Sequence, residues 1–142
     1  MVWPVRSARS VVVAVGRDAA SLDRLEALDS RARAVRSVGD RADDAAAIGA
    51  ALGGEADVVI DALGPTPIPD LTMAGFDVVD TDGTMVLLGG VRQSLPIPYD
   101  QLMRRRITLR GQPGLADRVL AARAARPPAP RIDSPHPRLR AG

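Results

Sequence analysis

Short runs of β-branched apolar residues alternate with segments of helical periodicity along most of this chain. The clearest run lies within Ala56–Gly64, where Val58, Val59 and Ile60 stand between two aspartates and a glycine closes the stretch. Such a continuous run is typical of a strand buried on both faces in a parallel sheet. We expect further strands at residues 11–15, 33–38, 84–88 and 107–110. Helices are expected over residues 19–28, 41–52 and 71–79, with one or two helical turns at 100–105.

Polar residues and glycines mark the ends of these helices. Asp18, Asp40 and Asp70 each precede a helical segment and are candidate N-caps, because their carboxylates can accept the free N–H groups of a first turn. Gly53 and Gly54 follow the second helix and are expected to stop it. The alternation of strand and helix predicts an α/β fold with a doubly wound parallel sheet.

Ligands of such folds bind at the carboxyl ends of the strands. Here these ends are Gly16-Arg17-Asp18 after the first strand, residues 61–64 after the third and Gly89-Gly90 after the fourth. The pattern therefore predicts a nucleotide-cofactor domain.

Composition narrows the possibilities further. The chain has 142 residues, of which 46% are hydrophobic, enough for one domain with a core. We expect an irregular segment at residues 1–10, the domain at 11–126 and a disordered Arg/Pro-rich tail at 127–142, with a helix-like stretch at 115–125. Cysteine is absent, and the single histidine, His136, lies in the tail, so neither a thiolate nor a histidine metal site is expected. No membrane span or signal peptide is recognisable, and a cytoplasmic protein is the expectation.

Charge is distributed unevenly along the chain. Residues 1–103 hold 9 arginines and 15 acidic residues, a net charge of −6, and residues 104–142 hold 10 arginines and 2 acidic residues, a net charge of +8. A basic tail can bind nucleic acid or acidic surfaces. Aromatic residues for base stacking are not interleaved with these arginines, which argues against nucleic acid.

Five segments together resemble one family, the medium-chain zinc-type alcohol dehydrogenases and quinone reductases. The segments are V-V-V-A-V-G-R-D, A-A-S-L-D-R-L-E-A-L, A-D-V-V-I-D-A-L-G, G-T-M-V-L-L-G-G-V and I-T-L-R-G, in family order across residues 11–111. The resemblance implies a partial Rossmann-like cofactor domain that lacks the family's first strand and glycine-rich turn. It also implies a nicotinamide dinucleotide as cofactor, NADP or NAD. The family's catalytic and zinc-binding residues have no counterparts here, so we expect no catalytic residue and no zinc site in this chain.

The same resemblance predicts a set of cofactor-binding residues. Gly16 occupies the strand end where NAD-dependent enzymes usually carry an acid, and Arg17 could pair with the 2′-phosphate of NADP. Asp18 keeps NAD open, because a shift of two residues would restore such an acid. Each position also has a purely structural interpretation, as a turn or a helix cap. The remaining candidates are Asp40 near the adenine, Leu63 and Gly64 near the riboses, and Gly89, Gly90 and Val91 near the nicotinamide.

Two questions of assembly follow from the resemblance. The full family sheet has the order 3-2-1-4-5-6, so loss of the first strand removes a central one. Either the strand at 11–15 moves beside the strand at 56–61, or a gap remains between them. The strand Ile107–Arg110 resembles the one through which the family pairs its Rossmann domains, which predicts a homodimer. Two functions stay open: part of an NADPH-preferring oxidoreductase, or a non-catalytic remnant or interaction protein with a basic tail.

Overall fold

The computed structural model describes residues 10–113. Our expectations for the irregular N-terminus, the helix-like stretch at 115–125 and the tail at 127–142 concern segments wholly or mostly outside these residues. Within them, strands and helices alternate as predicted. The elements are β1 (Val12–Gly16), α1 (Ala19–Leu28), β2 (Ala32–Arg36), α2 (Arg41–Leu52), β3 (Ala56–Asp61), α3 (Asp70–Asp77), β4 (Val79–Leu87), α4 (Tyr99–Arg104) and β5 (Thr108–Gly111).

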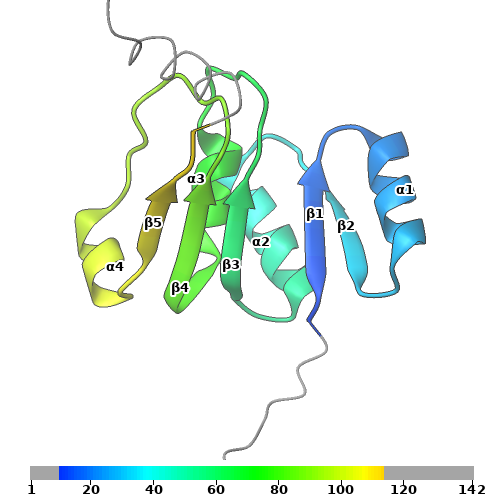
Figure 1. Cartoon of the computed structure of the whole chain (residues 1–142), viewed down its shortest axis with the longest axis horizontal. Helices are drawn as coiled ribbons and strands as arrows, with labels where there is room; N and C mark the ends of the chain where they lie inside the picture. Colours follow the sequence, from blue (N-terminus) through cyan, green and yellow to red (C-terminus); the bar gives the residue numbers. More distant parts are fainter. Residues whose placement is uncertain (1–9, 114–142) are drawn as a thin grey trace, which may run out of the picture. The chain divides into compact units, whose positions relative to one another are not determined.

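All strand pairs are parallel, but the strands form two sheets. β1 pairs with β2, and β3, β4 and β5 form a second sheet in that order. β1 and β3 are not hydrogen-bonded to each other, although they point the same way (Figure 1). Of the two arrangements left open by the sequence, the gap is therefore the one observed. It lies where the strand order of a complete doubly wound sheet places its first strand.

Helices α2 and α3 form one layer behind both sheets (Figure 1). A core cluster of Val35 from β2, Ile48 from α2, and Ala74 and Val78 from the α3 region also contacts Val13, Val15 and Val59 on the strands. A second cluster packs the other side of α3 against β4 and β5. Its buried members are Met73, Phe76, Val79, Met85 and Ile107. The shared layer shows why the two sheets stay aligned without hydrogen bonds between them (Figure 1).

The prediction that the third strand is buried on both faces is wrong. Val59 points toward the helices and packs in both clusters. Its neighbours Val58 and Ile60 point to the opposite face, where they are 58% and 62% exposed. The helical layer covers one face of β3 only, so this strand keeps an uncovered apolar face.

Three of the four predicted helix-end signals are found in the structure, and the exception is one helix start. Asp18 and Asp40 are N-caps, and Gly53 ends α2 in the left-handed conformation with φ of 74°. Asp70, however, is the first residue of α3 and not its cap, because Pro69 occupies the cap position without a side-chain hydrogen bond. The first turn of α3 therefore has no side-chain cap at this position.

Strand β4 begins at Val79, five residues earlier than expected. The Asp82-Gly83 pair, which indicates a turn, lies inside the strand, where Asp82 has φ of 63°. Pairing with β3 is irregular at this point, since Ala56 pairs with Val79 but Val58 pairs with Thr84. The predicted turn is thus a bulge within one strand.

Candidate functional site

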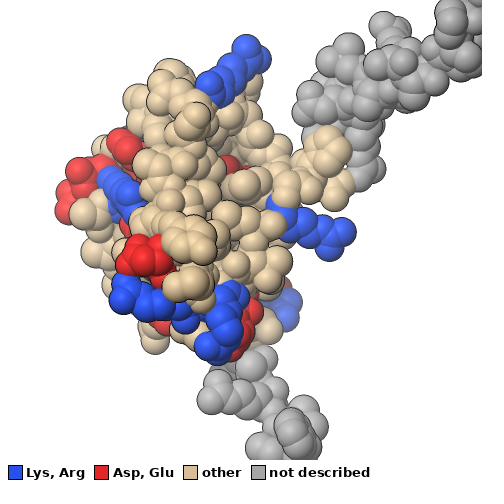
Figure 2. Space-filling model, turned by 90° about the vertical axis from the view of Figure 1, so that its left-hand side faces the viewer, with Lys and Arg blue, Asp and Glu red and all other residues tan. Residues whose placement is uncertain are grey.

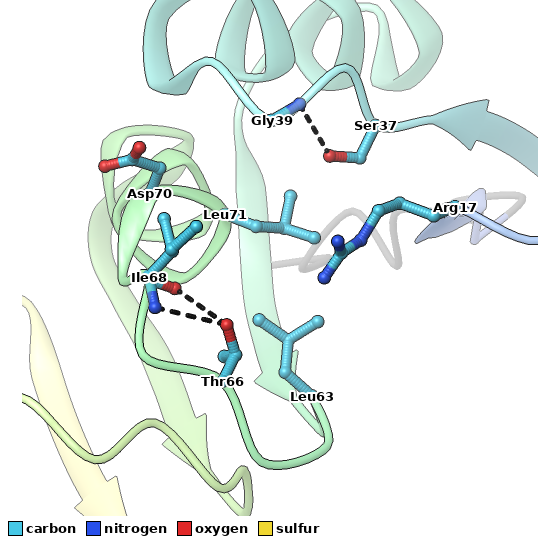
Figure 3. A pocket seen from close by; sticks show the side chains of 8 residues that line it. All are labelled: Arg17, Ser37, Gly39, Leu63, Thr66, Ile68, Asp70 and Leu71. Atoms are coloured by element: carbon cyan, nitrogen blue, oxygen red, sulfur yellow. Dashed lines mark hydrogen bonds between the residues drawn. The ribbon is translucent and has the colours of Figure 1, made fainter.

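A pocket opens where the chain leaves β1, β2 and β3. Because parallel strands end at the same edge, three loops meet there: β1–α1, β2–α2 and β3–α3 (Figure 3). The pocket volume is about 60 Å³, well below the ~300–1,000 Å³ of typical ligand pockets, so it holds part of a ligand and not a whole nucleotide. The lining residues are Arg17, Ser37, Gly39, Leu63, Thr66, Ile68, Asp70 and Leu71.

The β1–α1 loop contributes one cation to this pocket. The Arg17 side chain extends toward Leu63 and Leu71 on the far wall (Figure 3). Within residues 10–113, its guanidinium has neither a hydrogen bond nor an ion pair. Gly16 stands before it at the end of β1, and a Cβ there would lie 3.8 Å from Leu22 Cδ2 of α1.

Asp18, the third candidate in this loop, has a structural role. Its carboxylate accepts the Ser21 N–H at 3.0 Å and a further hydrogen bond from the Ser21 hydroxyl. The hydroxyl, and then the amide, lower the pKa of Asp18 below its usual value. The carboxylate is therefore engaged at the start of α1, and Asp18 does not line the pocket.

The β2–α2 loop forms a second wall through Ser37 and Gly39. Asp40 lies next to this wall but caps α2, accepting the N–H groups of Ala42 at 2.9 Å and Asp43 at 3.0 Å. Behind the wall, Asp44 is 1% exposed and bonds to the loop. Sequence reasoning did not single out Ser37 or Asp44, because a Ser and an Asp seven residues apart match no recognised motif.

The β3–α3 loop forms the opposite wall. Leu63 lines the pocket as predicted, while Gly64 lies in the same loop without lining it. The Thr66 hydroxyl oxygen accepts the Ile68 N–H at 3.2 Å, and this bond closes the turn around Pro67. The sequence analysis missed Thr66, Ile68, Asp70 and Leu71. The alternating prolines at 65, 67 and 69 indicate a segment without regular secondary structure, but they do not indicate which side chains it presents.

The three candidates after β4 support this loop and do not line the pocket. Gly90 N–H donates to Leu63 O at 2.8 Å, and Thr66 forms an isolated parallel bridge with Val91. Gly89 lies so close to β3 that a Cβ would be 2.7 Å from Asp61 Oδ1. A side chain at position 89 would therefore force the Asp61 carboxylate to move. Of the nine predicted residues, the pocket thus brings together Arg17 and Leu63, and the other seven adjoin it.

Metal-binding clusters and membrane-spanning helices are two features that would change the interpretation of the site. Residues 10–113 contain no group of three or more His, Cys, Asp or Glu side chains placed to hold a metal ion. Among the same residues, none of the helices has the length and apolar character needed to cross a bilayer. The expected cytoplasmic location stays a prediction.

Solved structures of known proteins show which fold this domain has. The chain matches benzyl alcohol dehydrogenase from Acinetobacter calcoaceticus with a TM-score of 0.59 and 20% identity. It matches an alcohol dehydrogenase zinc-binding domain protein from Burkholderia ambifaria with the same TM-score and 23% identity. Each match covers 72% of this chain and 27% of the other. A search of curated proteins finds no match. The domain is a partial, Rossmann-like α/β fold, as predicted.

The family follows from the sequence profile. The profile of the zinc-binding dehydrogenases matches residues 6–122, which is most of the chain. The chain belongs to this family, and the resemblance inferred from its five segments is confirmed. It spans about a quarter of the length of the two dehydrogenases whose structures it matches.

Proposed function

We propose that this chain is the cofactor-binding part of an alcohol dehydrogenase-like oxidoreductase and that it binds NADP(H). The observation that supports this most directly is Arg17, whose guanidinium extends into a pocket at the carboxyl ends of three parallel strands. In doubly wound folds the adenosine end of a dinucleotide lies at this edge. The small pocket would take one edge of that adenosine moiety, and the rest would lie across the loops.

A preference for NADPH over NADH follows from the charges around Arg17. Arginine can form two parallel hydrogen bonds with a 2′-phosphate, whereas NADH offers only a neutral hydroxyl there. Gly16 leaves the strand end without an acid, and the carboxylate of the adjoining Asp18 is bonded to Ser21 at the start of α1. Neither residue opposes a phosphate in the way that a free carboxylate at the strand end would.

The dinucleotide would supply hydride transfer at its nicotinamide ring. The residues described here would bind and orient its adenosine end, and we assign none of them a catalytic role. Leu63 and Leu71 give the pocket apolar walls, and Ser37 and Thr66 add hydroxyl groups. Apolar walls with a few polar groups are typical of cofactor pockets.

Calorimetric titration of two matched arginine variants with NADPH tests this proposal. Arg17→Ala is expected to weaken NADPH binding at least tenfold, because it removes the one cation that lines this pocket within residues 10–113. Arg24→Ala is the control, since Arg24 is an exposed residue of α1 outside the pocket lining. Equal affinities of the two variants would contradict the assignment of Arg17.

We also propose that β5 supports a homodimer. Within residues 10–113, β5 is the last strand of its sheet, and an edge strand offers its backbone groups for pairing with a second copy. Viewed from the α4 side, the surface is largely uncharged, with basic and acidic side chains close together near its lower end (Figure 2). Such mixed charge does not repel a second copy. Sedimentation equilibrium is expected to show a dimer, and a monomer at all concentrations would refute the proposal.

The uncovered face of β3 favours one alternative. Exposed Val58 and Ile60 form an apolar surface of the kind that marks a protein contact, which suits the non-catalytic interaction protein considered above. This alternative would gain support if the folded chain bound neither dinucleotide.

A further inference from the structure

Two buried carboxylates stand directly behind the walls of the pocket. The first is Asp44 in the first turn of α2, whose side chain is 1% exposed. It accepts the Ser37 hydroxyl at 2.6 Å, the Val38 N–H at 2.8 Å and the Gly39 N–H at 3.3 Å. The carboxylate therefore joins the start of α2 to the end of β2 and closes the loop between them.

The second carboxylate has the same arrangement on the opposite wall. Asp61, the last residue of β3, is 8% exposed. It accepts the Leu63 N–H at 3.0 Å and the Thr72 hydroxyl at 2.9 Å. Leu63 begins the β3–α3 loop, and Thr72 lies in the first turn of α3, so Asp61 joins the two ends of this loop.

We infer that Asp44 and Asp61 are positioning residues for the nucleotide, each fixing one wall of the pocket without touching the ligand. The inference rests on the proposed function. Each carboxylate bonds only to backbone N–H groups and hydroxyls of its own wall, and neither has an ion-pair partner among residues 10–113. Their positions exclude acid–base chemistry on the ligand, because both lie behind the residues that line the pocket.

Distances show what a carboxylate provides at position 44. Oδ1 accepts Val38 N–H, while Oδ2 accepts both the Ser37 hydroxyl and Gly39 N–H. Asparagine could keep the Val38 N–H on its oxygen and donate its NH₂ group to the Ser37 oxygen, but it would lose the bond to Gly39 N–H, since two donors cannot bond to each other. Gly39 N–H also bonds to Ser37 Oγ at 3.2 Å, so it keeps one acceptor. Asp44→Asn is therefore expected to weaken the loop less than Asp44→Ala, which removes all three bonds.

Position 61 differs in a way that gives an internal control. There, one carboxylate oxygen accepts an N–H and the other accepts a hydroxyl. Asparagine can keep both bonds, because its oxygen can accept Leu63 N–H while its NH₂ donates to the Thr72 oxygen. Asp61→Asn is expected to retain the wall, whereas Asp61→Ala loses it.

The test is calorimetric titration of the full chain and its variants with NADPH. Asp44→Ala and Asp61→Ala are each expected to raise the Kd at least tenfold, Asp44→Asn by a smaller factor than Asp44→Ala, and Asp61→Asn less than threefold. Asp43→Ala and Asp57→Ala are the matched controls, because each removes an exposed aspartate from the same element. We expect them to change the Kd less than twofold.

One more variant and one more readout distinguish a specific effect on the loop from a general loss of stability. Ile48→Ala empties a buried site on α2 away from the loop and lowers Tm, but it should leave the Kd near that of the wild type. Hydrogen exchange of the Val38 and Gly39 amides should become faster in Asp44→Ala and not in Ile48→Ala.

The possible outcomes distinguish failure of the positioning role from failure of the proposed function. If the wild type binds NADPH and Asp44→Ala binds it equally well, the positioning role is wrong while the proposed function stands. If Kd rises in proportion to the loss of Tm in every variant, including Ile48→Ala, the carboxylates are merely structural and the inference is overturned. If the folded wild type binds no dinucleotide, the proposed function fails and the inference fails with it.

Discussion

Replacement of Gly90 by alanine tests how tightly the loop after β4 supports the pocket. An alanine Cβ would lie 2.9 Å from Pro65 N, 3.0 Å from Pro65 Cα and 3.1 Å from the Gly64 carbonyl carbon. These neighbours are backbone atoms, which cannot rotate away as a flexible side chain could. The Gly90 N–H also donates to Leu63 O at 2.8 Å, so any shift of the loop strains this bond.

Overpacking of this kind costs about 1–3 kcal/mol. The loss of chain entropy in the unfolded state returns about 0.4–1 kcal/mol for a Gly→Ala change. The net expectation for Gly90→Ala is a destabilisation of about 1–2 kcal/mol, equivalent to a fall in Tm on the order of 5–15 °C. Urea denaturation followed by circular dichroism measures the free energy of unfolding directly.

The matched control is Gly64→Ala, in the loop that Gly90 contacts. A Cβ at Gly64 would meet no atom within 4 Å. Its free energy of unfolding is expected to stay within about 1 kcal/mol of the wild type. If Gly90→Ala is as stable as Gly64→Ala, the close backbone approach is not a constraint, and the structural interpretation of this glycine is refuted.

Three further predictions concern ion pairs and the uncovered face. Arg41 and Asp77 join α2 to α3 through two bonds of 2.6 and 2.7 Å and are about one-third exposed, so Arg41→Ala should lower the free energy of unfolding by about 1–2 kcal/mol after allowance for solvent screening. No change in urea denaturation would contradict this. Hydrogen bonds from the Arg31 side chain, and then from its amide, lower the pKa of Asp29 to about 2. Because the folded pKa lies below the ordinary value, the bond stabilises the protein above about pH 4 and is lost as pH falls toward 2. An NMR titration of Asp29 should give a midpoint near 2 that rises in Arg31→Ala, and an unchanged midpoint would disprove the pairing. Ile60 is 62% exposed, so Ile60→Thr should alter the free energy of unfolding by no more than about 0.5 kcal/mol and raise solubility, whereas a large loss would show that another segment covers this face.

The order of elements could be predicted because local signals determine it. Apolar runs marked the strands, and Asp18 and Asp40 marked helix starts through hydrogen bonds within three residues. Gly53 marked a helix end for an equally local reason, its left-handed conformation. These interactions depend on neighbours in sequence, which a single sequence displays.

Other features depended on contacts between distant segments. The Asp82-Gly83 pair has the composition of a turn, yet it continues β4 because Asp82 N–H donates to Arg105 O at 2.8 Å and its carboxylate pairs with Arg106. Gly75 weakens a helix in isolation, but a Cβ there would lie 3.1 Å from Val59 Cγ1, so glycine allows α3 to approach the sheet. Neither contact is visible in local sequence.

The candidate site was predicted in outline but not in detail. The strand ends indicated an edge of the sheet where a small pocket lies, lined by Arg17 and Leu63 among the predicted residues, while cofactor binding there stays a prediction. Gly89 and Gly90 were attributed to cofactor approach on resemblance, whereas here they pack against β3 and its loop. Ser37 and Thr66 were missed because three loops converge only after folding.

The central claim is that the carboxyl ends of β1, β2 and β3 still form a dinucleotide site. Calorimetric titration of the purified, folded chain with NADPH and separately with NADH tests it most directly. The account predicts NADPH binding in the micromolar range and weaker binding of NADH, because Arg17 would pair with the 2′-phosphate. No binding of either dinucleotide, or equal binding of both, would contradict it.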